Sequence, residues 1–218
     1  SLTPKLSFKA LGLGAEAYPF DWLRVSLRGL IHFIRNDFKG FFEFATLRDV
    51  YVPNLEEVLT MYRSQYHSFW YDDPRHSGMR ESYLKRISNF HALSASTHPV
   101  LFVRAVATTH ELKYASMLTR AIIEKFGVMA TLLLIIDFQD SSGAYVVQDE
   151  PNLMLYFLKT KPVQAPHCDP IVVAMEWAAG KRVSAAVLPN INAALPLLRE
   201  DHSQLTMGGV PIFEESGL

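Results

Sequence analysis

The sequence predicts an α/β fold in which a mostly parallel central sheet is flanked by helices within a single domain. Three observations lead to this prediction. Residues 100–106 and 129–136 are apolar runs, interrupted only by Arg104 and Thr131, and both contain β-branched side chains, as in strands that are covered on both faces. A helical pattern lies between them, so strand, helix and strand form a parallel crossover unit. The chain has 218 residues, of which 49% are apolar, and this suffices for one substantial core.

In the first part of the chain, the sequence pattern predicts mainly helices. A helix beginning in residues 19–21 carries apolar side chains at helical spacing, namely Leu23, Leu27, Leu30, Ile31 and Ile34. The phenylalanines within residues 38–44 are expected in the core. Asn54 is expected to cap a short helix that ends near Arg63, and a strand is expected over residues 67–70. The next helix presents one apolar stripe, formed by Met79, Tyr83, Ile87 and Phe90.

In the second part of the chain, the sequence pattern predicts alternating strands and helices. The helix between the two apolar runs begins near His110 and is ended by Gly127. A third strand is expected over residues 153–158. The following helix is signalled at both ends, because Asp169 is placed as N-cap before a proline and Gly180 follows the last turn. A strand, a short helix and a tail are expected after it.

Charge and cysteine content narrow the classes of function. The 21 basic residues nearly balance the 22 acidic ones, so no strong field would concentrate the protein on nucleic acid. The single cysteine, Cys168, excludes an internal disulfide and fits a reducing compartment, the cytoplasm or an organelle interior. No apolar run approaches the ~20 residues needed to span a bilayer, and peripheral membrane association stays open. The sequence begins at Ser1 rather than at Met. We therefore expect that a targeting segment, or part of the domain itself, can precede Ser1.

Three motifs point to relatives. Residues 19–22 read Pro-Phe-Asp-Trp, Tyr83 stands three residues before an Arg-Ile pair, and residues 101–104 read Leu-Phe-Val-Arg. With this combination the chain resembles an uncharacterised family described as papain-like cysteine peptidases. The resemblance covers about residues 1–160, which leaves residues 161–218 as a helix-rich extension of the same domain. It implies a peptidase scaffold with a cysteine nucleophile and a histidine base.

Neither catalytic residue stands where the resemblance places it. The nucleophile would fall near Ser1, where a hydroxyl replaces the reactive thiolate. The family's Phe-x-His-Asp motif maps onto a segment that puts Tyr71 at the histidine and Asp72 at the aspartate. A tyrosine phenol, with an ordinary pKa near 10, cannot accept a proton from a thiol at pH 7 as an imidazole can. Ser1, Tyr71 and Asp72 therefore form a candidate degenerate site, with His67 or His76 as alternative bases.

Three further residues are expected to support this site, namely Asp21, Trp22 and Arg104. Arg104 ends a buried strand, so its guanidinium must be paired, and Asp21, Asp72 and Asp137 are the candidate partners. We favour an ion pair that fixes loops around the cleft over ligand binding. For Asp21, capping of the first helix is favoured over orienting the site.

The remaining chemistry-bearing groups have structural interpretations. Residues 167–169 read His-Cys-Asp, but neighbours along an extended chain point to different sides and cannot form one catalytic line. Cys168 is expected to be a small buried thiol. The eight histidines show no pairing at metal-ligand spacing, so the sequence predicts neither a metal nor a cofactor.

The favoured hypothesis is a pseudoenzyme that acts by binding, as an accessory subunit of a larger assembly with a protein partner. The aromatic residues within 38–44 and 62–71 are available for an interface. The alternative is an active cysteine hydrolase whose nucleophile lies upstream of Ser1 and whose base is His67 or His76. A third, weaker interpretation is a carbohydrate- or nucleotide-modifying enzyme that would use Asp137 and Asp140.

Overall fold

The computed structural model describes residues 2–14, 16–52, 56–106, 108–159 and 165–199, together with the backbone of 206–207 and 210–211. Its helices pack against two sheets, one antiparallel and one mostly parallel. The predicted α/β fold class is therefore confirmed, although the sequence does not predict the antiparallel sheet.

The larger sheet has five strands in the order β5-β6-β8-β7-β9. Their bounds are β5 (Val100–Ala105), β6 (Ala130–Ile136), β7 (Gly143–Val147), β8 (Glu150–Phe157) and β9 (Ala185–Leu188). Strands β5, β6 and β8 run parallel, β7 is antiparallel to β8, and β9 is parallel to β7. All of β6 is buried, as expected for a central strand with helices on both faces. The two apolar runs and the third predicted strand thus correspond to β5, β6 and β8.

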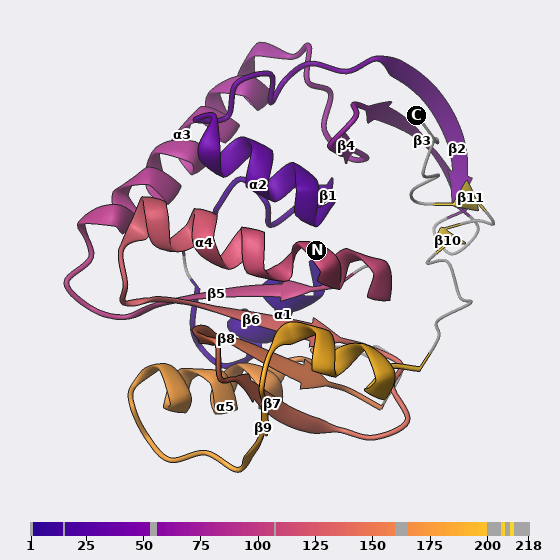
Figure 1. Cartoon of the computed structure of the whole chain (residues 1–218). Coiled ribbons are helices and arrows are strands. Elements are labelled where there is room, and N and C mark those ends of the chain that lie inside the picture. The colour runs from indigo at the N-terminus through magenta and orange to yellow at the C-terminus, as the bar shows by residue number, and fades with distance from the viewer. Residues whose placement is uncertain are drawn as a thin grey trace.

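Helices cover both faces of this sheet (Figure 1). They are α1 (Leu2–Ala10), α4 (Ala115–Phe126), which follows the 3-10 helix η2 (Thr109–Tyr114), and α5 (Cys168–Ala178). On one face Leu132 and Leu134 of β6 share a core with α4. On the other face Leu133 and Ile135 pack with Ile171 of α5, and α1 contacts both α5 and β5. Alternate β6 side chains therefore serve two separate cores, as the strand period requires. The 3-10 helix η3 (Ile191–Leu197) follows β9.

The smaller sheet is antiparallel, with the order β1-β4-β3-β2. Its strands are β1 (Arg24–Val25), β2 (Thr46–Val52), β3 (Glu57–Arg63) and β4 (His67–Phe69), and the helices near it are α2 (Leu27–Arg35), α3 (Ser77–Ala92) and the 3-10 helix η1 (Leu93–Ala95). β2 and β3 form a hairpin that extends away from the helices (Figure 1). A separate two-stranded pair is formed by β10 (Thr206–Met207) and β11 (Val210–Pro211).

An aromatic cluster joins this sheet to the helices. Phe33 of α2 contacts Phe38 and Phe41 with ring centroids 6.2 Å and 5.2 Å away, and Phe20 stacks on Phe38 at 5.3 Å. Phe38 and Phe41 are buried, so the expected core position of residues 38–44 is confirmed for them. Offset and edge-to-face rings of this kind contribute roughly 0.5–1.5 kcal/mol per pair beyond their buried area.

Three predicted element boundaries are wrong. The first predicted helix begins at Leu27, because Ser26 caps it by accepting a hydrogen bond from the Gly29 amide, 3.0 Å away. Residues before Arg63 form strand β3 rather than a helix, and Asn54 lies outside the described residues. Asp169 is the second residue of α5 and not its N-cap, since the helix begins at Cys168.

Candidate functional site

The turn after β4 holds the residues predicted to replace the catalytic histidine and its aspartate. The Tyr71 side chain is 60% exposed. Asp72 accepts a hydrogen bond of 2.9 Å from the Tyr83 hydroxyl of α3. Burial, together with the nearby Asp72 charge, raises the pKa of Tyr83 above its ordinary value. Asp72 therefore anchors the turn to α3 rather than orienting Tyr71.

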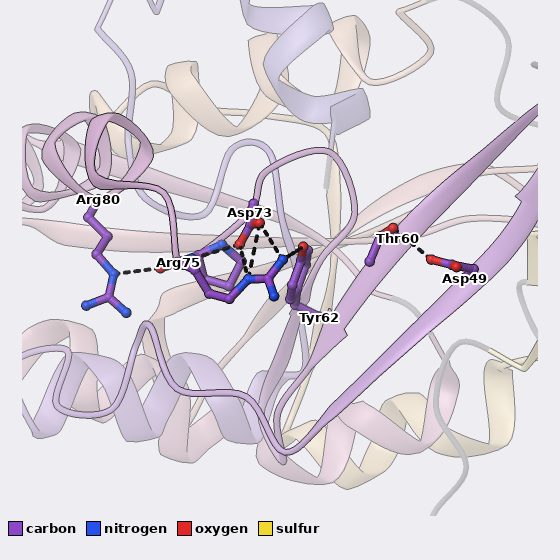
Figure 2. Close-up of polar contacts among 7 residues, drawn as sticks. Asp49, Thr60, Tyr62, Asp73, Arg75 and Arg80 are labelled. Atoms are coloured by element: carbon purple, nitrogen blue, oxygen red, sulfur yellow. Dashed lines mark hydrogen bonds and ion pairs between the residues drawn. The ribbon is translucent and has the colours of Figure 1, made fainter.

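The same turn is fixed by an arginine–carboxylate pair (Figure 2). The Arg75 guanidinium donates to both carboxylate oxygens of Asp73 at 2.8–3.2 Å, and also to the Tyr62 hydroxyl at 2.9 Å. This hydrogen-bonded guanidinium holds the pKa of Asp73 below its ordinary value. His76 lies next to the turn, at the exposed start of α3, where its carbonyl accepts the Arg80 amide. The turn is thus a hydrogen-bonded polar loop with an exposed phenol at the mapped base position.

His67, the other candidate base, is a buried residue of β4. Its Nε2 lies 2.7 Å from the Phe41 carbonyl and its Nδ1 lies 2.6 Å from the Ser64 hydroxyl. The ring also stacks on Phe41, with centroids 5.2 Å apart. Burial lowers the pKa of His67 from 6.5 to about 4, so the imidazole is neutral at pH 7. Both nitrogens are therefore occupied within the aromatic core.

This burial predicts a loss of stability in mild acid. The unfolded chain takes up a proton at this histidine as the pH falls through 6.5, whereas the folded chain does so only near 4. The stability present above pH 6.5 is consequently lost toward pH 4, by up to about 3 kcal/mol. Urea unfolding at pH 7.0, 5.5 and 4.5 should show a shallower loss for His67→Gln than for the parent. The exposed His98, replaced in the same way, should leave the parent slope unchanged.

The N-terminus of α5 brings together a second imidazole and the single thiol. Cys168 is partly exposed, and its sulfur donates to the Ser7 carbonyl at 3.8 Å. The neighbouring His167 is fully buried, and its Nε2 lies 3.0 Å from Asp137 Oδ1. No hydrogen bond joins Cys168 to an imidazole within the described part of the chain. The His167–Asp137 pair is not predicted from the sequence. The only available signal was the position of Asp137 directly after buried strand β6.

The residues expected to support the site divide between a cavity and the surface. A cavity of about 500 Å³ lies beside β5 and is lined mainly by apolar side chains, with Asp21 and Arg104 among its lining residues. Trp22 is 42% exposed and does not line it. None of the candidate catalytic residues in the described chain, Tyr71, Asp72, His67 and His76, lines this cavity. Ser1 lies outside the described residues.

Each charged group of the cavity has a partner of opposite charge. Asp21 lies 3.3 Å from the Lys5 ammonium and accepts a hydrogen bond from the Tyr18 amide at 3.0 Å, so it fixes the preceding turn and does not cap α2. Arg104 donates to the Val25 carbonyl at 2.7 Å and lies 3.5 Å from Glu111. The partner of Arg104 is therefore a residue of η2 and none of the three aspartates proposed from the sequence.

Two further features bear on the class of site. Among the described residues, no three His, Cys, Asp or Glu side chains are grouped so that they could hold a metal ion. Within the same residues, no helix is both long and apolar enough to cross a membrane. The cavity beside β5 is lined mainly by apolar side chains, and its volume falls in the usual range for binding sites.

The Pro-Phe-Asp-Trp turn and the Leu-Phe-Val-Arg strand meet at this cavity, because Phe20, Asp21 and residues 101–104 line it. The chain belongs to the family described as "Putative papain-like cysteine peptidase (DUF1796)", whose model matches residues 3–140. The resemblance inferred from the motifs is thereby confirmed. Comparisons with curated proteins and with solved structures gave no significant match.

Proposed function

We propose that this chain is a non-catalytic member of its family, a pseudoenzyme that binds a protein partner as an accessory subunit of a larger assembly. The observation that carries the proposal is the position of the cysteine thiol relative to the residue that stands at the mapped base position. The only thiol, Cys168, contacts the Ser7 carbonyl, while the mapped base position holds the exposed Tyr71. Cysteine peptidase chemistry requires a thiolate with an imidazole in hydrogen-bond reach.

The state of the imidazoles supports the same proposal. Both nitrogens of His67 are engaged in the core, and Nε2 of His167 faces Asp137. His76 is exposed and directly follows Arg75 in the chain. The use of one free cysteine and no disulfide fits a reducing compartment, so we place the protein in the cytoplasm or in an organelle interior.

Most of the aromatic residues first considered for an interface are buried and not available for one, although Tyr71 is exposed. Phe38, Phe41, Tyr62 and Phe69 are buried within the protein. The partner surface is therefore sought at the cavity beside β5, where apolar groups line an open space.

The test is a hydrolysis assay on the natural full-length protein and on its Cys168→Ser variant, with fluorescein-labelled casein as substrate. Both proteins are expected to release label no faster than buffer. Release above buffer that survives Cys168→Ser and is abolished by thiol alkylation would contradict the proposal, because it would require a different, catalytic cysteine. Thermal unfolding of both proteins verifies that the samples are folded.

A further inference from the structure

We propose that the free edge of β5 binds an extended, uncharged apolar peptide segment of a partner protein, which adds to the larger sheet as a sixth strand. This inference rests on the proposed function, because it names the surface and the chemistry by which a binding member of the family would hold its partner.

β5 is an edge strand whose outward backbone groups are unused. The Val100 amide donates to the Met129 carbonyl and the Val106 amide to the Ile135 carbonyl, so the even-numbered residues face β6. In a parallel pair the alternate residues point the other way. The amides and carbonyls of Leu101, Val103 and Ala105 thus face outward, and no hydrogen bond to them occurs within the described part of the chain. Half-buried strand edges of this kind are templates for pairing with another strand.

The cavity runs along this edge, since all six residues of β5 line it. The strand spans roughly 20 Å at ~3.3 Å per residue, which is enough for an added strand of about five residues. A small lipid-like molecule could fill the apolar space but could not satisfy a row of alternating donors and acceptors. The backbone of a peptide satisfies them directly, which favours a peptide as the occupant.

The walls of the cavity match the alternating side chains of a strand. One wall lies on the α4 face of the sheet and consists of large apolar residues, namely Leu30, Ile34, Phe90, Leu118 and Ile122. The other wall includes Phe8 of α1 and Met175 and Ala178 of α5. A strand whose successive side chains point to opposite faces would bury both sets. An apolar sequence on both faces is therefore expected.

The charges of the cavity favour a neutral segment. Lys5 is balanced by Asp21, and Arg104 by Glu111, so a charged side chain would enter an environment with no free counter-charge. One donor is left over. The Nε of Arg104 is buried and makes no hydrogen bond within the described residues, and Arg104 is only 8% exposed. Buried donors are normally satisfied, and a peptide carbonyl is a suitable acceptor for this one.

The binding test uses a labelled peptide, acetyl-Lys-Val-Ile-Val-Leu-Val-Ile-Lys-amide, and an analogue with the same side chains that is N-methylated at the central amides. Fluorescence anisotropy with the 218-residue chain should give saturable binding of the first peptide. The methylated peptide should bind at least about tenfold more weakly, because its backbone cannot donate to β5. Equal binding of the two peptides, or no binding of either, would overturn the proposal.

Two protein variants locate the site. Val103→Pro removes one outward amide and leaves the ladder to β6 intact, and Ala178→Phe fills one wall of the cavity. Each of these two variants should bind the first peptide about tenfold more weakly than the parent does. The control variant Val172→Phe, on the exposed side of α5, should bind it with an affinity within twofold of that of the parent. Circular dichroism confirms that each variant is folded. Unchanged binding by both Val103→Pro and Ala178→Phe would place the peptide elsewhere and refute the assignment.

Two more readouts separate this inference from the proposed function. Mass spectrometry of the recovered peptide shows whether it is cleaved. Cleavage would contradict the non-catalytic proposal while leaving strand addition at β5 intact. Peptide binding by the 218-residue chain but not by the longest natural form of the protein would show that the protein itself covers the groove. A self-association that the peptide reverses would assign the groove to a second copy. Either result would overturn the assignment to a partner protein.

Discussion

Replacement of Glu111 by alanine is expected to lower the free energy of unfolding by about 3–5 kcal/mol, the range found when one partner of a buried ion pair is removed. Glu111 Oε1 accepts the Leu27 amide at 2.9 Å, and Oε2 lies 3.5 Å from the Arg104 guanidinium. The Glu111 and Arg104 side chains are only 12% and 10% exposed. The alanine variant therefore leaves a buried cation without its counter-charge and the first amide of α2 without an acceptor.

Two control variants separate these effects. Glu111→Gln keeps an acceptor for the Leu27 amide and loses only the charge, so its destabilisation should lie between those of the parent and the alanine variant. Glu124→Ala removes an exposed ion pair with Arg35 and should cost at most about 1 kcal/mol. Urea unfolding monitored by circular dichroism supplies all three values. A Glu111→Ala variant as stable as Glu124→Ala would contradict the role given to this pair.

The second large effect is expected for Gly29→Ala in α2. A Cβ at this position would lie 2.5 Å from the Tyr66 carbonyl oxygen and 2.9 Å from a methyl carbon of Val25. The first neighbour is backbone, so α2 would have to move away from the segment that joins β3 and β4. Overpacking of this kind costs typically about 1–3 kcal/mol, which outweighs the gain of up to about 1 kcal/mol in helix propensity.

The matched control is Gly78→Ala in the first turn of α3. There the nearest atom to a new Cβ is Cε1 of the exposed His76 ring, 3.3 Å away, which can rotate aside. This variant should be as stable as the parent or more stable. Thermal unfolding of the two variants tests the prediction. A stable Gly29→Ala protein would mean that α2 is not held against Tyr66 as closely as described.

The core of the larger sheet was predictable because its signals are local. A short apolar run that contains β-branched residues and follows a proline or a glycine favours a strand over a buried helix, which is why β5 and β6 follow from the sequence. The helical spacing of the apolar residues between them predicts α4. The helix end at Gly127, where φ is +87°, is equally local.

The hairpin of β2 and β3 was not predictable by the same means. Leu47, Tyr51 and Val58 are exposed on one face of the hairpin, while Val50 and Met61 are buried on the other. Apolar residues on both faces remove the alternation that identifies a half-buried strand. Pro19 and Asp21 are competing start signals for this helix, and the pairing of β1 with β4 keeps residues 24–25 extended, so that α2 begins after Ser26.

The contacts between the site residues could be predicted even less well from local sequence patterns. Arg104 meets Glu111 across the end of a strand, and His167 meets Asp137 from 30 residues away. Neither pair has a spacing pattern that could reveal it. The motifs predict Asp21, Arg104 and Tyr71 as site residues, whereas it is the fold that places Asp21 and Arg104 at the cavity and Tyr71 at the surface.

The most direct test of the non-catalytic proposal is covalent labelling with an epoxysuccinyl probe that modifies activated peptidase thiolates. Intact mass spectrometry would be performed on the natural full-length protein and its Cys168→Ser variant. We predict that neither protein gains the mass of the probe. A stoichiometric adduct that persists in Cys168→Ser would show that an activated cysteine other than Cys168 is present, and would contradict the assignment of this chain as a binding member of its family.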